Sequence, residues 1–133
     1  MKNTTTSVTV MLVDKDAAAL NGLKLLLEIE DDIKVVGQVA KSDRILVQVR
    51  KYHPNVVLMD FFDSYSQGLD IVKRISSEFP GIKIIIMTTY PIAVREVLHA
   101  GACHVFLKDC VPDELFDAIR NQHSTRDSMS KSH

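Results

Sequence analysis

The sequence has few of the residues that mark several large classes of protein. It contains no tryptophan and only two cysteines, Cys103 and Cys110, among 133 residues. Two cysteines are too few for the disulfide framework of a small secreted domain, and they suit a reducing compartment. The longest apolar runs, such as Ile84–Met87, are far too short to span a bilayer. We therefore expect a cytoplasmic protein that does not contact a membrane.

An excess of charge of one sign is also missing. Sixteen lysines and arginines face 17 aspartates and glutamates, which leaves a net charge of −1. This balance favours neither direct nucleic-acid binding nor a polybasic membrane surface. The sequence has no phosphate-binding P-loop, glycine-rich dinucleotide turn or nucleophile elbow, so we do not expect an enzyme. What remains, with 46% hydrophobic and 25% charged residues, is ordinary globular composition with room for one core.

Five short apolar runs alternate with segments of helical period. The runs are Val8–Val13, Ile33–Val39, Val56–Met59, Ile82–Met87 and His104–Leu107. The central runs are almost continuously hydrophobic, which is typical of strands buried on both faces of a parallel sheet. The segments between them carry apolar residues three and four positions apart, as in Leu20, Leu23 and Leu27. The pattern predicts an α/β fold: a flavodoxin-like, doubly wound, five-stranded parallel sheet of the (βα)5 type, with strand order 2-1-3-4-5.

The helix boundaries and the end of the domain can also be predicted. Asp16 can N-cap the first helix, Pro80-Gly81 ends the third, and Pro112 opens the fifth from its first turn. The last residues contain one apolar side chain and no periodicity. We expect one domain over residues 1–122 and a polar tail or linker over residues 123–133.

Polar residues follow four of the predicted strands. They are Asp14-Lys15-Asp16 after the first, Asp60 after the third, Thr88-Thr89 after the fourth, and Lys108-Asp109 after the fifth. Every strand must end in something polar, so one such residue carries little weight; four in this combination predict a shared site. Ligands of doubly wound sheets bind beyond the carboxyl ends of the strands. A carboxylate can attack phosphorus, while a lysine and a hydroxyl can hold phosphoryl oxygens.

These residues resemble a known family, the CheY-like receiver domains of response regulators. Val10–Asp14 resembles the first receiver strand and the start of its acidic pocket, and Val56–Asp60 is similar to the phosphoacceptor strand. Gly68 stands eight residues after Asp60, and Thr88 stands 28 after it, as in the NarL/LuxR-type subfamily. The stretch Ala100-Gly101-Ala102, followed by Phe106-Leu107-Lys108-Asp109, is close to that subfamily's fifth strand. The resemblance covers roughly residues 7–121.

The resemblance implies a function and a role for each matching residue. Asp60 would accept a phosphoryl group from a sensor histidine kinase, a phosphotransfer protein or a small phosphodonor. Thr88 would bind the phosphoryl group and Lys108 would pair with it. Asp14 and Asp60 would hold Mg²⁺ together with the main-chain carbonyl of Phe62. The output would be a shift of the face formed by the fourth helix, fifth strand and fifth helix, with homodimerisation as one outcome. That shift would control transcription through a DNA-binding domain outside this chain.

Lys15 departs from the family pattern, because most receivers have a second metal-binding aspartate at this position. The exchange changes the local charge by two units, and Mg²⁺ commonly needs one or two carboxylates. Two outcomes are open: Lys15 turns to solvent while Asp16 or Asp63 replaces the ligand, or the metal site is weakened or absent. We expect weak Mg²⁺ binding, with the Lys15 ammonium between Asp14 and Asp60.

Other departures concern the surroundings of the acceptor. Asp63-Ser64 replaces the family's Met-Pro pair, and Phe62 and Tyr90 occupy positions that border the phosphate in the family. These two rings either shield the site from water or simply pack under a loop. Val105 replaces the switch aromatic three residues before the lysine, so coupling through an aromatic swing is not expected.

Three functions are compatible with the sequence. The first is a phosphorylatable receiver that controls an output. The second, favoured by Lys15 and Val105, is a degenerate receiver that acts as a phosphorylation-independent protein-interaction module. The third is a flavodoxin-like small-molecule binder, which would need a phosphate-binding loop after the first strand; Lys15-Asp16-Ala17 does not supply one.

Overall fold

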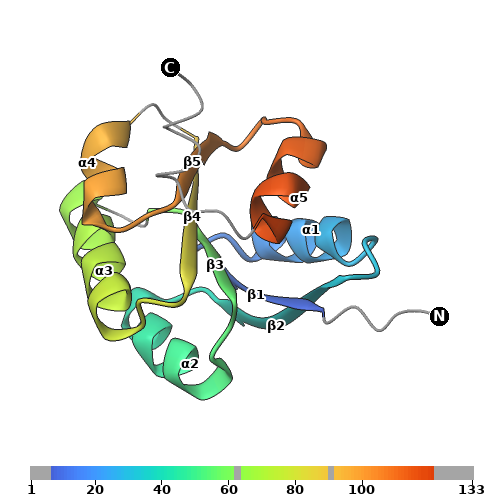
Figure 1. The fold of residues 1–133 in the computed structure, drawn as a ribbon, viewed down its shortest axis with the longest axis horizontal. Coiled ribbons are helices and arrows are strands. Elements are labelled where there is room, and N and C mark those ends of the chain that lie inside the picture. Colours follow the sequence, from blue (N-terminus) through green and yellow to red (C-terminus); the bar gives the residue numbers. More distant parts are fainter. Residues whose placement is uncertain (1–6, 62–63, 90–91, 122–133) are drawn as a thin grey trace.

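The chain forms a five-stranded parallel sheet with helices on both faces (Figure 1). The computed structural model describes residues 7–61, 64–89 and 92–121. The strand order is β2-β1-β3-β4-β5, as predicted. The strands are β1 (Val8–Val13), β2 (Ile33–Val39), β3 (Val56–Met59), β4 (Lys83–Thr88) and β5 (His104–Leu107). The helices are α1 (Ala17–Leu27), α2 (Ile45–Tyr52, preceded by a 3-10 turn over Ser42–Arg44), α3 (Tyr65–Glu78), α4 (Val94–Ala100) and α5 (Pro112–Arg120).

The observed boundaries follow the predicted ones closely. Asp16 caps α1, Pro112 is the first residue of α5, and four strands have the predicted bounds. β4 begins and ends one residue later than predicted. The Ile82 N–H donates to the Phe79 carbonyl in the preceding turn, and Thr88 pairs with Leu107 in the sheet. The predicted tail over residues 123–133 lies outside the described residues.

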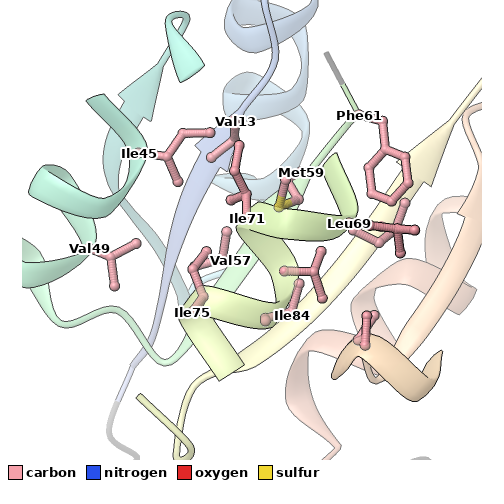
Figure 2. Packing of buried hydrophobic residues seen from close by; sticks show 14 of the residues in the cluster. Val13, Ile45, Val49, Val57, Met59, Phe61, Leu69, Ile71, Ile75 and Ile84 are labelled. Atoms are coloured by element: carbon pink, nitrogen blue, oxygen red, sulfur yellow. The ribbon is translucent and has the colours of Figure 1, made fainter. Parts of the chain in front are cut away.

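The sheet separates two hydrophobic clusters. Helices α2, α3 and α4 cover one face, and α1 and α5 cover the other (Figure 1). Successive residues of β3 alternate between the clusters: Val57 and Met59 pack toward α3, while Val56 and Leu58 pack toward α1 and α5. Because side chains alternate along a strand, this two-sided burial requires the continuous apolar runs seen in the sequence. Figure 2 shows the first cluster, where residues of α2 and α3 meet those of the strands.

Polar contacts fix the end of α5 that lies away from the carboxyl edge of the sheet. The Arg120 guanidinium donates to both carboxylate oxygens of Asp32, at 2.7 and 2.8 Å, and it also pairs with Glu30. These hydrogen bonds lower the pKa of Asp32 below its usual value. Lys83 Nζ donates to the carbonyl of Ala118 at 2.9 Å. Arg120 thus links the last turn of α5 to the residues just before β2, and Lys83 of β4 binds a main-chain carbonyl of that turn.

The carboxyl ends of β1, β3, β4 and β5 meet at one edge of the sheet. The Asp60 N–H donates to the Val13 carbonyl at 2.9 Å, and the Lys108 N–H donates to the Thr88 carbonyl at 2.9 Å. The polar residues that follow these strands are thus neighbours in space, as the parallel topology predicts. Among the described residues, no helix is long and apolar enough to cross a membrane.

Candidate functional site

Two carboxylates lie side by side at this edge. Val13 and Met59 are paired in the sheet, so the residues that follow them, Asp14 and Asp60, are brought together by register. The Asp14 side chain is 11% exposed and the Asp60 side chain 20% exposed. Two carboxylates this poorly hydrated are stabilised by a nearby cation or by protonation of one of them.

Lys108 supplies that cation from the end of β5. Its Nζ lies 2.6 Å from Asp14 Oδ2 and 3.1 Å from Asp60 Oδ2, so one ammonium joins both carboxylates. β4 separates β5 from β3, and the lysine side chain is long enough to cross it. We expected Lys15 to occupy the position between the carboxylates; the described residues place Lys108 there. The exposed Lys15 lines the same pocket.

The shared ammonium and the burial shift the pKa values of the groups it joins. Burial raises the pKa of the Asp60 carboxyl; the Lys108 ammonium opposes that rise, and the charge of Asp14 adds to it. Burial alone would lower the pKa of Lys108, but its hydrogen bonds to Asp14 and Asp60 outweigh burial and raise it. Lys108 therefore stays protonated at neutral pH.

Asp16 has a structural role next to the pair. Its Oδ1 accepts from the N–H groups of Ala18 and Ala19 at 3.0 and 3.4 Å, which caps α1. Its own N–H donates to Asp14 Oδ1 at 2.9 Å. Asp14 thus accepts hydrogen bonds on both oxygens, one from the backbone and one from Lys108, and its position is firmly held.

A pocket with a volume of about 440 Å³ opens above the carboxylates. Its lining combines acids, cations, hydroxyls and aromatic rings: Asp14, Lys15, Asp16, Asp60, Phe61, Ser64, Tyr65, Thr88, Thr89, Ile92 and Lys108. Thr88, at the end of β4, is only 4% exposed. The predicted residues Asp14, Lys15, Asp16, Asp60, Thr88 and Lys108 therefore surround one space.

Two aromatic rings form one wall of this pocket. Phe61 and Tyr65 meet edge to face, with ring centroids 5.6 Å apart. Phe61 rests directly on α3, because a Cβ added to Gly68 would lie 2.5 Å from its ring. The Tyr65 hydroxyl donates to Glu96 Oε1 on α4 at 2.6 Å. Neither Tyr65 nor Glu96 was predicted from the sequence as a site residue.

The arrangement of a buried carboxylate, a partner carboxylate, a lysine and a threonine at one sheet edge can be compared with known proteins. The family model "Response regulator receiver domain" matches residues 10–120. The chain belongs to the response regulator receiver family. The match begins within β1 and runs to the last residue of α5.

Named relatives and solved structures agree with the family. The receiver is 33% identical over 115 residues to the "Uncharacterized transcriptional regulatory protein YxjL" of Bacillus subtilis, covering 85% of this chain and 53% of that protein. The chain thus spans about half the length of the curated relatives that it matches. A LuxR-family response regulator from Aurantimonas sp. SI85-9A1 superposes with a TM-score of 0.78 at 25% identity, over 86% of this chain and 83% of that one. The isolated REC domain of RcsB from Salmonella enterica, solved with the phosphomimetic BeF3⁻, gives a TM-score of 0.75 at 25% identity, over 85% and 86%.

Receiver domains generally bind Mg²⁺ at their acidic phosphorylation site, and the donors of this receiver can be compared with that need. Asp14 and Asp60 offer two carboxylates, while one oxygen of Asp16 is used by the helix cap. Within the described ranges, no three acidic, histidine or cysteine side chains group as a metal site. These two carboxylates are enough for Mg²⁺, which commonly takes one or two carboxylates; phosphate oxygens and water would complete its octahedral coordination. The predicted ligand Phe62, as well as Asp63 and Tyr90, lies outside the described residues.

Proposed function

We propose that Asp60 of this receiver accepts a phosphoryl group and that Thr88 and Lys108 bind it. The observation that carries the proposal is the Lys108 ammonium, held 3.1 Å from the carboxylate of Asp60 at the mouth of a pocket of about 440 Å³. Asp60 lies at the end of a buried strand, is 20% exposed and has a fixed surrounding of polar groups. A phosphoryl group entering this pocket meets its acceptor and its counter-ion together.

The chemistry requires only a carboxylate nucleophile and charge stabilisation. An oxygen of Asp60 attacks phosphorus, and the bond from phosphorus to the donor's leaving atom breaks and leaves its electron pair with the donor. The carboxylate becomes an acyl phosphate and gains about one negative charge. Lys108 already touches Asp60, so its ammonium can follow the added charge. Thr88 offers a hydroxyl donor from the adjacent strand.

The donors and the output belong to the same proposal. A sensor histidine kinase, a phosphotransfer protein or a small acyl phosphate would supply the phosphoryl group. The relatives are transcriptional regulators, and we infer that the output is control of transcription by a DNA-binding domain outside these residues. The face formed by α4, β5 and α5 would carry the signal, with a homodimer as one form of output.

The direct test is intact-mass analysis of the chain after incubation with acetyl phosphate, with and without Mg²⁺. We expect one phosphoryl mass in the wild type and none in Asp60→Asn. A phosphorylated Asp60→Asn protein would refute the assignment of the acceptor. A wild type that gains no mass under any condition would instead favour a phosphorylation-independent interaction module. Lys15 and Val105 are the features that favour this second function.

Weak magnesium binding forms the second part of the proposal. Lys15 adds a positive charge to a pocket whose two acceptor-side carboxylates already share Lys108. When bound, Mg²⁺ would neutralise and orient phosphoryl oxygens, held by Asp14 and Asp60. We expect Lys15→Asp to strengthen Mg²⁺ binding and phosphorylation together, as measured by calorimetric titration and by intact mass. If the wild type binds Mg²⁺ as tightly as Lys15→Asp, the lysine has no role in the metal site.

A further inference from the structure

The structure joins the acceptor pocket to α4 through a side chain that the family pattern does not mark. Tyr65 is the first residue of α3, and Ser64 fixes its position by accepting from the Gln67 N–H at 3.1 Å. From there its ring lines the pocket that also contains Asp60 and Thr88. Tyr65 is therefore anchored at its backbone and borders the space that a phosphoryl group on Asp60 would enter.

The Tyr65 ring packs against Phe61, the residue that follows Asp60. Phe61 packs edge to face against it, with planes inclined by 62°. Phe61 itself cannot retreat from the pocket, because it already lies against the backbone of Gly68. A displacement of the chain at Asp60–Phe61 would therefore act on the tyrosine ring, since closely packed side chains transmit strain.

The hydroxyl of Tyr65 binds Glu96 on the neighbouring helix α4. Its hydroxyl donates to the Glu96 carboxylate at 2.6 Å, 31 residues along the chain. Glu96 lies in the first turn of α4, and α4 packs beside α3 (Figure 1). The hydrogen bond to Glu96 raises the pKa of Tyr65 to about 12, so the phenol keeps its proton throughout the physiological range.

The position of the family's switch aromatic, three residues before Lys108, cannot connect the pocket to α4 in this receiver. Val105 on β5 has no ring to swing, and it is packed against the core cluster beneath α3 and α4. Tyr65 both lines the pocket and hydrogen-bonds α4 through its side chain.

We propose that Tyr65 couples phosphorylation of Asp60 to the position of α4, by holding Glu96 in the unphosphorylated state and releasing it when the pocket fills. The inference rests on the proposed function of Asp60. The hydrogen bond stabilises the arrangement of α3 and α4 in this structure relative to any arrangement that lacks it. Breaking it shifts the population toward the state that phosphorylation favours.

The test follows backbone amides of α4, such as Val97 and Leu98, by NMR in the full chain before and after acetyl phosphate. Tyr65→Phe removes only the hydroxyl, and Glu96→Gln removes only the charge. The matched control is Glu78→Gln, which weakens another exposed contact of α3, the one to Arg50 at 2.7 Å. Intact mass measures phosphorylation in parallel.

We expect phosphorylation to move the α4 amides of the wild type. In the unphosphorylated protein, Tyr65→Phe and Glu96→Gln should each shift the α4 amide resonances in the direction that phosphorylation shifts them in the wild type. Each variant should also raise the phosphorylation rate about two- to fivefold, the factor expected from one exposed polar contact. The double variant should move them no further than one single variant, and the control should not move them. Unchanged α4 amides in both single variants would overturn the proposal.

The proposed function and the coupling can fail separately. If the wild type gains no phosphoryl mass, the function of Asp60 fails, and the coupling is judged in the unphosphorylated protein. Glu96 does not line the pocket, so Glu96→Gln should still shift the amides of Thr88 and Lys108 if Tyr65 connects the two regions. No shift at these amides refutes the connection itself.

Discussion

Replacing Lys108 by methionine tests the electrostatic design of the site most directly. The substitution keeps an unbranched side chain of similar length and removes one ammonium that lies 2.6 Å from Asp14 and 3.1 Å from Asp60. At an effective dielectric near 20, each contact is worth about 5–6 kcal/mol of Coulomb attraction before desolvation is subtracted. Loss of one partner of a fully buried pair costs about 3–5 kcal/mol. Lys108 is 32% exposed, so we expect a loss of about 2 kcal/mol at pH 7.

The loss should depend on pH in a defined direction. Without the ammonium, burial and the neighbouring carboxylate still raise the pKa of Asp60, and only the backbone hydrogen bond at Phe61 is left to oppose them. A carboxyl whose folded pKa is raised above the unfolded value destabilises the folded state as pH rises through the folded pKa. The gap between Lys108→Met and wild type should therefore be small near pH 4 and full at pH 7.

Urea unfolding at several pH values measures this gap. Lys73→Met, an exposed lysine on α3, is the control and should change the free energy of unfolding by less than about 0.5 kcal/mol. In the Lys108→Met background, Asp60→Asn should recover at least about 1 kcal/mol, because it removes one of two unpaired like charges. If Lys108→Met is as stable as Lys73→Met at pH 7, or if its loss is the same at pH 4 and 7, the reasoning is wrong.

Three further predictions use urea unfolding of single variants. Gly68→Ala should cost about 1–3 kcal/mol, because the added Cβ would lie 2.5 Å from an aromatic ring; Gly22→Ala meets nothing within 4 Å and should gain about 0.5–1 kcal/mol. Asp32→Asn should lose stability at pH 7, and this loss should vanish as pH falls below 3.8, because Arg120 lowers the folded pKa of Asp32. Asp60→Asn should gain stability relative to wild type as pH rises above 3.8, because the folded pKa of Asp60 is raised. An equal difference at all pH values would contradict either aspartate prediction.

The fold could be predicted because its signal is periodic and local. The run Val56–Met59 is apolar at every position, and all four residues are buried, alternately on the two faces of the sheet. Caps gave equally local signals: the Asp16 side chain bonds residues only two and three positions later. Only the bounds of β4 differ from the prediction, because Ile82 hydrogen-bonds Phe79 in a turn, and the hydrophobic pattern does not reveal such a bond.

The site residues could be predicted as a group, but their pairing could not. Parallel topology brings the ends of four strands to one edge, and this was enough to place Asp14, Asp60, Thr88 and Lys108 around one pocket. Which cation reaches the carboxylates depends on side-chain direction. Lys15 is adjacent to Asp14 in sequence, yet Lys108, 94 residues away, joins Asp14 to Asp60. The Tyr65–Glu96 bond likewise depends on how α3 and α4 pack, which no spacing in the sequence encodes.

The charges that line the pocket connect Lys15 with the rest of the site. Three carboxylates, on Asp14, Asp16 and Asp60, face two ammonium groups, on Lys15 and Lys108, which leaves a net charge of −1. An aspartate at position 15 would make that sum −3, and an acyl phosphate would add about one further negative charge. A divalent cation is then the natural neutraliser of such a site. With Lys15 present, the phosphorylated pocket would reach only about −2 before any metal binds. On the proposed function, Mg²⁺ would then be needed less to neutralise the pocket than to orient the phosphoryl oxygens.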